Sequence, residues 1–237
     1  MNRVLFAAFC VLMALPASAQ RTPAVDSFRT SGGDLTITCI GHGSLMFTFG
    51  KKTIHVDPVS SMGDYSTLPK ADLILITHEH GDHLDAKAIQ AISTAQTTII
   101  ANPGSSEALP SATILRNGEA KTVAGFSIEA VPSYNPAKAF HPKGNGNGYV
   151  ITFADTRVYV AGDTEYVPEM KDLKAIDIAF LPMNLPYTMT PEQVADAARA
   201  FRPKVLYPYH FGNSDTSALV ALLKDEKGIE VRIRDMK

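Results

Sequence analysis

A short segment, residues 77–83 (THEHGDH), concentrates side chains that bind metals well. Its pattern, His-x-His-x-Asp-His, uses three of the seven histidines in the chain. A turn at the end of a strand can direct such side chains into one cavity, and neutral imidazoles with a carboxylate suit zinc and similar divalent metals. We expect His78 and His80 to face one metal ion, and Asp82 and His83 to face a second.

Two more candidate ligands stand at the ends of apolar, strand-like runs. Asp163 follows residues 158–161, and His210 follows residues 205–209. Alone, each is more typical of a capping aspartate or a structural histidine, but beside the first motif they complete a two-metal set. Two cations lower the pKa of a shared water, so the expected chemistry is attack of a metal-bridged hydroxide on an ester, lactone or phosphodiester. Asp82 is also expected to orient this water, which gives it a catalytic role.

The elements that must position these residues follow from periodicity and from turn residues. The predicted strand Leu73–Thr77 is apolar in its first four residues, as expected of a strand buried on both faces. Along the chain the predicted elements are strands at first and then strands alternating with helices. This order predicts an α+β fold with two sheets face to face and helices outside. The expected strands are 35–40, 45–49, 53–56, 73–77, 98–101, 126–131, 149–153, 157–161, 178–181, 205–209 and 229–233, the expected helices are 85–92, 190–201 and 216–224, and residues 20–33 are expected to form a loose lead.

Two residues near the first strands have open roles. His42 could face the metals, or it could be a packed, hydrogen-bonded histidine at a strand end. Asp57 precedes Pro58, so it could accept a hydrogen bond from a ligand imidazole or simply form a turn.

The HEHGDH segment, Gly162-Asp163-Thr164 and the late His210 together resemble the metallo-β-lactamase superfamily. The branch that the chain looks like contains ascorbate-phosphate lactonase and related metal-dependent hydrolases. The resemblance implies a four-layer αββα sandwich with the metals at one edge, between the sheets. It also implies a lactonase-like activity, which is an inference by analogy.

One position departs from that pattern. In the superfamily a third histidine for the first metal comes from the loop after strand 126–131, where this chain has Asn135. Asn135 could be a weak ligand, His141 could replace it, or the first metal could be loosely held. We favour a weakened first site with Asn135 near it, and His141 as a ligand of either metal or substrate.

The same loop, residues 135–148 (NPAKAFHPKGNGNG), is too rich in Pro, Gly and Asn for regular structure. Its length beside a metal site makes it a candidate substrate lid. Lys138, His141 and Lys143 could offer positive charge to a phosphate or carboxylate, or they could belong to a solvated loop.

The amino-terminal end reads as a targeting segment. A basic start, the apolar run 4–15 and Ala17-Ser18-Ala19 are typical of a signal peptide removed after residue 19. We therefore expect one hydrolase domain over residues 20–237, periplasmic or secreted, without stable membrane insertion. The formal net charge of −2 and the lack of a basic run argue against nucleic acid.

The predicted function is that of a metal-dependent hydrolase, and the expected partner is a small-molecule substrate. Two divalent ions are expected, zinc before manganese or iron. A phosphodiesterase or phospholipase on the same metals is the first alternative. A non-catalytic metal-binding module is the second, and Asn135 is its best support. The sequence does not specify an oligomeric state.

Overall fold

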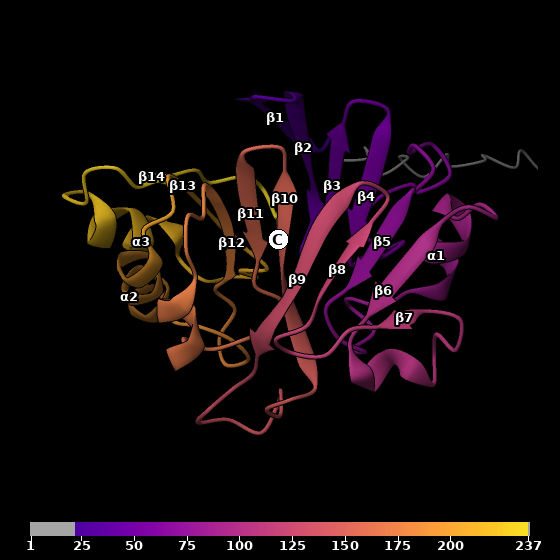
Figure 1. Ribbon diagram of the computed structural model, residues 1–237. Helices are drawn as coiled ribbons and strands as arrows, with labels where there is room; N and C mark the ends of the chain where they lie inside the picture. The colour runs from indigo at the N-terminus through magenta and orange to yellow at the C-terminus, as the bar shows by residue number, and fades with distance from the viewer. Residues whose placement is uncertain (1–21, 237) are drawn as a thin grey trace, which may run out of the picture.

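The computed structural model describes residues 22–236, which form two β-sheets packed face to face with helices on the outside (Figure 1). The first half of the chain builds one sheet and the second half builds the other. This is the predicted four-layer αββα sandwich, and the fold class is confirmed. The predicted signal peptide, residues 1–19, lies outside the described residues, so export from the cytoplasm stays a prediction.

Each sheet has seven strands in sequence order, and the elements have these bounds. The first sheet holds β1 (Ala24–Thr30), β2 (Gly33–Gly41), β3 (Ser44–Phe49), β4 (Lys52–Val56), β5 (Leu73–Ile76), β6 (Thr98–Ala101) and β7 (Thr113–Ile114). The second holds β8 (Ala120–Val123), β9 (Phe126–Ser133), β10 (Gly146–Phe153), β11 (Thr156–Val160), β12 (Ile178–Pro182), β13 (Val205–Tyr209) and β14 (Glu230–Val231). The helices are α1 (Ala86–Ile92), α2 (Pro191–Phe201) and α3 (Thr216–Leu223), with 3₁₀ turns η1 (Pro103–Ser106) and η2 (Pro168–Asp172).

Both sheets follow the same plan. Strands β1 to β4 pair antiparallel, and β4 to β7 pair parallel. In the second sheet β8 to β11 pair antiparallel, and β11 to β14 pair parallel. In each parallel part the carboxyl ends of the strands meet at one edge of the sheet, so residues that directly follow these strands are brought together.

Strand β5 shows how the layers are built, because successive side chains of a strand point to opposite faces. Leu73 and Leu75 lie in the core between the two sheets. Ile74 and Ile76 belong to a second cluster, which also contains residues of α1. Both faces of β5 are therefore buried, as its unbroken apolar run predicts.

Helix α2 begins where the sequence indicates. The Thr190 side chain accepts a hydrogen bond from the backbone N–H of Gln193, and the Gln193 side chain accepts one from the backbone N–H of Thr190. This capping box satisfies two donors that a helix start otherwise leaves unpaired. The buried face of α2 packs into the main core through residues that include Val194 and Ala198.

Replacing Thr190 by alanine is expected to lower the free energy of unfolding by about 1 kcal/mol, because the capping oxygen is lost. Urea denaturation of the metal-free chain measures this change. Metal content should match that of the parent, since Thr190 lies outside the metal-ligand candidates. An unchanged unfolding midpoint would show that the cap contributes nothing.

The expected loose lead over residues 20–33 is wrong for its described part, residues 22–33. Residues 24–30 form the edge strand β1, which pairs antiparallel with β2 from Ala24–Cys39 to Thr30–Gly33. Its side chains alternate between exposed and partly buried positions, so a polar sequence is compatible with a strand that has one solvated face. The short edge strands β7 and β8 were not predicted, and the closing strand is only Glu230–Val231. Within residues 22–236, no helix combines the length and the apolar character needed to cross a membrane.

Candidate metal centre

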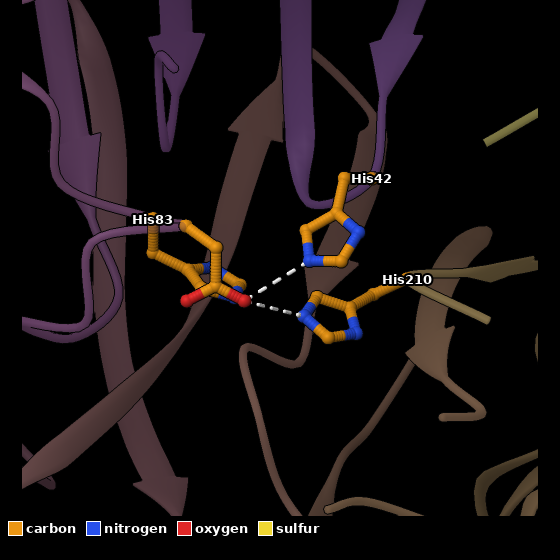
Figure 2. Close-up of side chains that lie close together, drawn as sticks. His42, His83 and His210 are labelled. Carbon is orange, nitrogen blue, oxygen red and sulfur yellow. Dashed lines mark hydrogen bonds and ion pairs between the residues drawn. The ribbon is translucent and has the colours of Figure 1, made fainter. Parts of the chain in front are cut away.

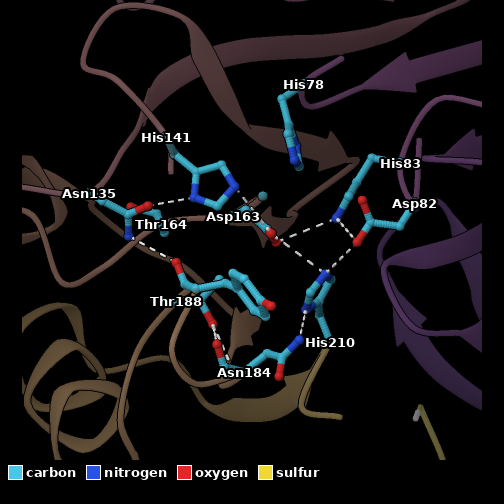
Figure 3. Close-up of polar contacts among 12 residues, drawn as sticks. His78, Asp82, His83, Asn135, His141, Asp163, Thr164, Asn184, Thr188 and His210 are labelled. Carbon is cyan, nitrogen blue, oxygen red and sulfur yellow. Dashed lines mark hydrogen bonds and ion pairs between the residues drawn. The ribbon is translucent and has the colours of Figure 1, made fainter. Parts of the chain in front are cut away.

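The predicted site residues gather at the edge where the parallel strands of both sheets end (Figure 3). The first sheet supplies the segment after β5 and Asp57 after β4, and its β2–β3 turn supplies His42. The second sheet supplies the β9–β10 loop with His141, Asp163 after β11 and His210 after β13. Eight of these side chains form three groups, and within each group the candidate ligand atoms lie within 4.8 Å of one another: His42, Asp82, His83 and His210; His78, His80 and His141; and His78, His83 and Asp163.

Asp163 occupies the middle of the cluster. Its Oδ1 lies 3.5 Å from Nε2 of His83, and its Oδ2 lies 3.5 Å from Nε2 of both His141 and His210. Burial opposes a charge on this carboxyl, but the surrounding histidines, His210 and His83 foremost, hold its pKa below the ordinary value. Asp163 is therefore a carboxylate between the two predicted metal positions.

Asp82 groups with His83, His210 and His42 at the second candidate position, and Figure 2 shows how these three histidines lie together. Its Oδ2 lies 3.0 Å from Nε2 of His42 and 3.4 Å from Nε2 of His210. The neighbouring imidazoles of His210 and His42 lower the pKa of Asp82. The rings of His42 and His210 pack with centroids 3.7 Å apart, so His42 faces the cluster rather than the core.

Asp57 connects the ligand candidates to the β-sheet. Its buried Oδ2 lies 2.8 Å from Nδ1 of His83 and accepts a hydrogen bond from the Thr77 hydroxyl at 2.6 Å. Because the single hydroxyl proton of Thr77 goes to Asp57, Thr77 must accept from Nδ1 of His78, 3.0 Å away. His78 and His83 therefore carry their ring protons on Nδ1 and turn Nε2 toward the cluster. This is the orienting role that the sequence left open for Asp57, and Thr77 is a partner that it did not identify.

The structure distinguishes the two loop residues considered for the first position, Asn135 and His141, by their contacts. His141 groups with His78 and His80 as a candidate ligand set, and the Asn135 side chain is hydrogen-bonded to the His141 ring. The Asn135 amide nitrogen donates to the carbonyl of Tyr187 at 3.1 Å, which leaves its oxygen to accept from Nδ1 of His141. Asn135 thus orients the imidazole that occupies the place of the expected histidine, as a carboxylate or carbonyl does beside metal-bound histidines.

Several polar atoms in the cluster are buried without a hydrogen-bond partner. They are Nε2 of His78, His83 and His210, and Oδ1 of Asp163. Leaving such an atom unpaired costs about 1–3 kcal/mol, and four together at one place indicate a missing common partner. Imidazole nitrogen and carboxylate oxygen are the donors that zinc and related divalent ions accept. The residues present therefore fit a metal centre.

The backbone at the site is strained in the way that functional sites often are. His42, Asp57 and His210 all have left-handed conformations, with φ of 53°, 45° and 46°. A Cβ on Gly43 would lie 2.7 Å from Cε1 of His83, so only glycine lets the β2–β3 turn approach this ring. The backbone N–H of His210 donates to the carbonyl of His42 at 3.1 Å, which ties the two sheets together at the cluster.

A cavity of about 340 Å³ opens beside the cluster, and its walls include three residues that the sequence did not indicate: Phe140, Asn184 and Tyr187. Within residues 22–236, no lysine or arginine lines this cavity. Lys138 contacts Glu165 and the carbonyl of Thr188, and Lys143 contacts Glu169 and Tyr134. The two loop lysines, considered above as substrate contacts, are thus engaged elsewhere.

Comparisons with known proteins agree with this geometry. A family profile described as the beta-lactamase superfamily domain matches residues 36–210. A UPF0173 metal-dependent hydrolase from Thermococcus kodakarensis is 33% identical over 185 residues, which cover 73% of this chain and 82% of the relative. Another from Symbiobacterium thermophilum is 30% identical over 216 residues, 85% of this chain and 92% of the relative.

Two solved structures are also similar to this chain. A crystal structure from Parabacteroides distasonis, named as a metal-dependent hydrolase, is 56% identical, with a TM-score of 0.88 over 91% of this chain and 100% of that one. Igni18, a metallo hydrolase from Ignicoccus hospitalis, shares the fold with a TM-score of 0.70 at 23% identity, over 85% of this chain and 95% of that one. The chain therefore belongs to the metallo-β-lactamase superfamily and, within it, to the UPF0173 family of metal-dependent hydrolases.

Proposed function

We propose that this hydrolase cleaves a small ester or lactone with the help of two divalent metal ions, zinc being preferred. The first ion would be held by His78, His80 and His141, the second by the remaining members of the cluster, and Asp163 would contact both. The observation that carries the proposal is the set of buried, unpartnered nitrogen and oxygen atoms that converge on one cavity. When bound, such ions supply Lewis acidity and lower the pKa of water to about 7.

The chain's own residues supply orientation. Asp57, Thr77 and Asn135 hold three imidazoles with Nε2 toward the cavity. Asp82 keeps a low pKa, and its side chain is half exposed, so its carboxylate can accept a hydrogen bond from an attacking water and fix the direction of attack. It cannot serve as a proton donor at neutral pH.

The character of the cavity favours a neutral substrate over a phosphodiester. Its walls carry carboxylates, imidazoles, an amide and two aromatic rings, with no side-chain cation among the described residues. A phosphodiester would bring a negative charge close to Asp82 and Asp163, with only the metal ions to offset it. The ester or lactone carbonyl carries no such charge.

A substrate panel tests the proposal. The zinc-loaded chain is assayed with γ-lactones, aryl esters and bis-aryl phosphates under the same conditions. We expect turnover of lactones or esters to exceed that of phosphates by at least about tenfold, a difference near 1.4 kcal/mol in activation free energy. Preferential cleavage of phosphates would make the protein a phosphodiesterase on the same site. The grouping of His141 with His78 and His80 supports a complete first position, which weighs against the alternative of a non-catalytic metal-binding module.

Metal binding is expected to release about one proton per chain at pH 8. Burial disfavours a charged His83, but the carboxylates of Asp163 and Asp57 outweigh it and raise the pKa of His83 to about 9. A metal ligand must be a neutral imidazole, so metal affinity should fall about tenfold for each pH unit below about 9. Calorimetric titration with zinc in two buffers of different ionisation enthalpy counts the protons. The Asp57→Asn variant should release fewer, and an absence of proton release from the parent at pH 8 would contradict the raised pKa.

A further inference from the structure

Large apolar side chains gather in the two loops beside the cavity. Among residues 22–236, six large hydrophobic side chains are at least a third exposed, and three of them fall in these loops. Phe140 is 43% exposed, Tyr187 is 45% exposed, and Leu185 in the same loop as Tyr187 is 48% exposed. A concentration of exposed apolar area at one place indicates a contact surface more than a chance arrangement.

Two of these side chains meet. The rings of Phe140 and Tyr187 contact edge to face, with centroids 5.0 Å apart and an interplanar angle of 68°. Both line the cavity that also contains Asp82, Asp163 and His210. An apolar surface therefore stands in the same cavity as the candidate metal ligands.

The backbones that carry the two rings are fixed to each other. The Asn135 amide donates to the carbonyl of Tyr187, and Lys138 donates to the carbonyl of Thr188 at 2.8 Å. The backbone N–H of Asn135 also donates to the carbonyl of His141 at 2.8 Å, which closes the short loop that carries Phe140. Loop residues 135–141 are thus tied to the opposite loop, so the aromatic pair exists before a ligand binds, which reduces the entropy lost on binding.

We propose that the Phe140–Tyr187 pair is a binding subsite for an uncharged apolar group, alkyl or aryl, attached next to the bond that is cleaved. Such a group would cover aromatic area that is now exposed, and each buried methylene would add to affinity. This inference deepens the proposed function and rests on its assignment of the cavity as the substrate site. It predicts that substrates with an apolar substituent are preferred over otherwise identical small ones.

Binding of carboxylates to the zinc-loaded chain tests the subsite without turnover. Calorimetry compares acetate, hexanoate and phenylacetate, which share the carboxylate and differ in the apolar part. We expect hexanoate and phenylacetate to bind at least about tenfold more tightly than acetate, because several methylene equivalents leave water. In Phe140→Ala and Tyr187→Ala this preference should shrink to about threefold or less, while acetate affinity and zinc content stay at the parental values.

Two further variants make the test specific. Tyr187→Phe keeps the ring and should keep the preference, whereas Val220→Ala removes another exposed apolar side chain, on α3, and should change nothing. Equal binding of acetate and hexanoate to the parent, or a preference that survives in both alanine variants, would overturn the subsite.

Turnover separates this inference from the proposed function. The parent is assayed with γ-butyrolactone and with γ-nonalactone, which adds an alkyl chain to the same reacting ring. If neither lactones nor esters are cleaved but the carboxylate preference holds and depends on the rings, the proposed reaction fails and the subsite stands. If both lactones are cleaved and the carboxylates bind equally, the reaction stands and the subsite fails.

Discussion

Replacement of Asp163 by alanine is expected to reduce metal-supported hydrolysis by at least about 10³-fold and to lower the bound metal below two ions per chain. Asp163 lies between both candidate positions, with His83 on one oxygen and His141 and His210 on the other. Removing this carboxylate would take a ligand from each of the two proposed metal ions, and it removes a buried negative charge that lies 3.5 Å from Nε2 of all three rings. Metal ions contribute several kcal/mol to such reactions, and each 1.36 kcal/mol corresponds to a factor of ten in rate.

Elemental analysis and hydrolysis of the preferred ester or lactone measure the two effects together. Asp163→Asn keeps the size of the side chain and removes its charge, so it should lose activity as well. Asp172→Ala, which changes an exposed carboxylate in η2, serves as the matched control and should retain both metal and rate. Full activity of Asp163→Ala would exclude the two-metal mechanism.

The layers of the fold could be predicted because each depends on a local pattern. The run that became β5 is apolar at every position, and its alternate residues fill two different cores. The start of α2 is fixed by Thr190 and Gln193, which are close in sequence. Strand β1 could not be predicted in this way, because an edge strand with one solvated face needs few apolar residues and is held mainly by backbone pairing with β2.

The site residues also differ in whether a local sequence pattern predicts them. Four ligand candidates lie within one six-residue segment, and Asp163 and His210 come within three residues of the ends of buried strands, so topology alone brings them together. The position of His141 depends instead on tertiary hydrogen bonds between Asn135 and Tyr187, which nothing in the loop sequence reveals. Phe140 and Tyr187 were missed for another reason: an aromatic side chain in a loop carries no chemical signal until its neighbours are known.

The second large effect is expected from His141, which the structure groups with His78 and His80 at the first metal position. His141→Ala is expected to remove one of two metal ions and to lower kcat/KM by at least about 10²-fold, because one metal loses a third of its imidazole ligands. Asn135→Ala should be milder: it keeps the ligand and loses only the oxygen that orients it, a change that typically weakens metal affinity about 10–100-fold. Equilibrium dialysis at fixed free zinc, followed by elemental analysis, ranks the two variants.

Asn135→His distinguishes this arrangement from a weakened first site. Asn135 is buried, and its amide is used by the Tyr187 carbonyl and by Nδ1 of His141. A histidine there would break both contacts, so bound metal should decrease or stay unchanged. An increase in bound metal for Asn135→His, together with two ions retained by His141→Ala, would show that residue 135 marks the ligand position after all. If His141 completes the first position, His141→Ala loses metal and Asn135→His gains none; if residue 135 marks that position, Asn135→His gains metal and His141→Ala keeps it. The pair therefore decides which residue completes the first position.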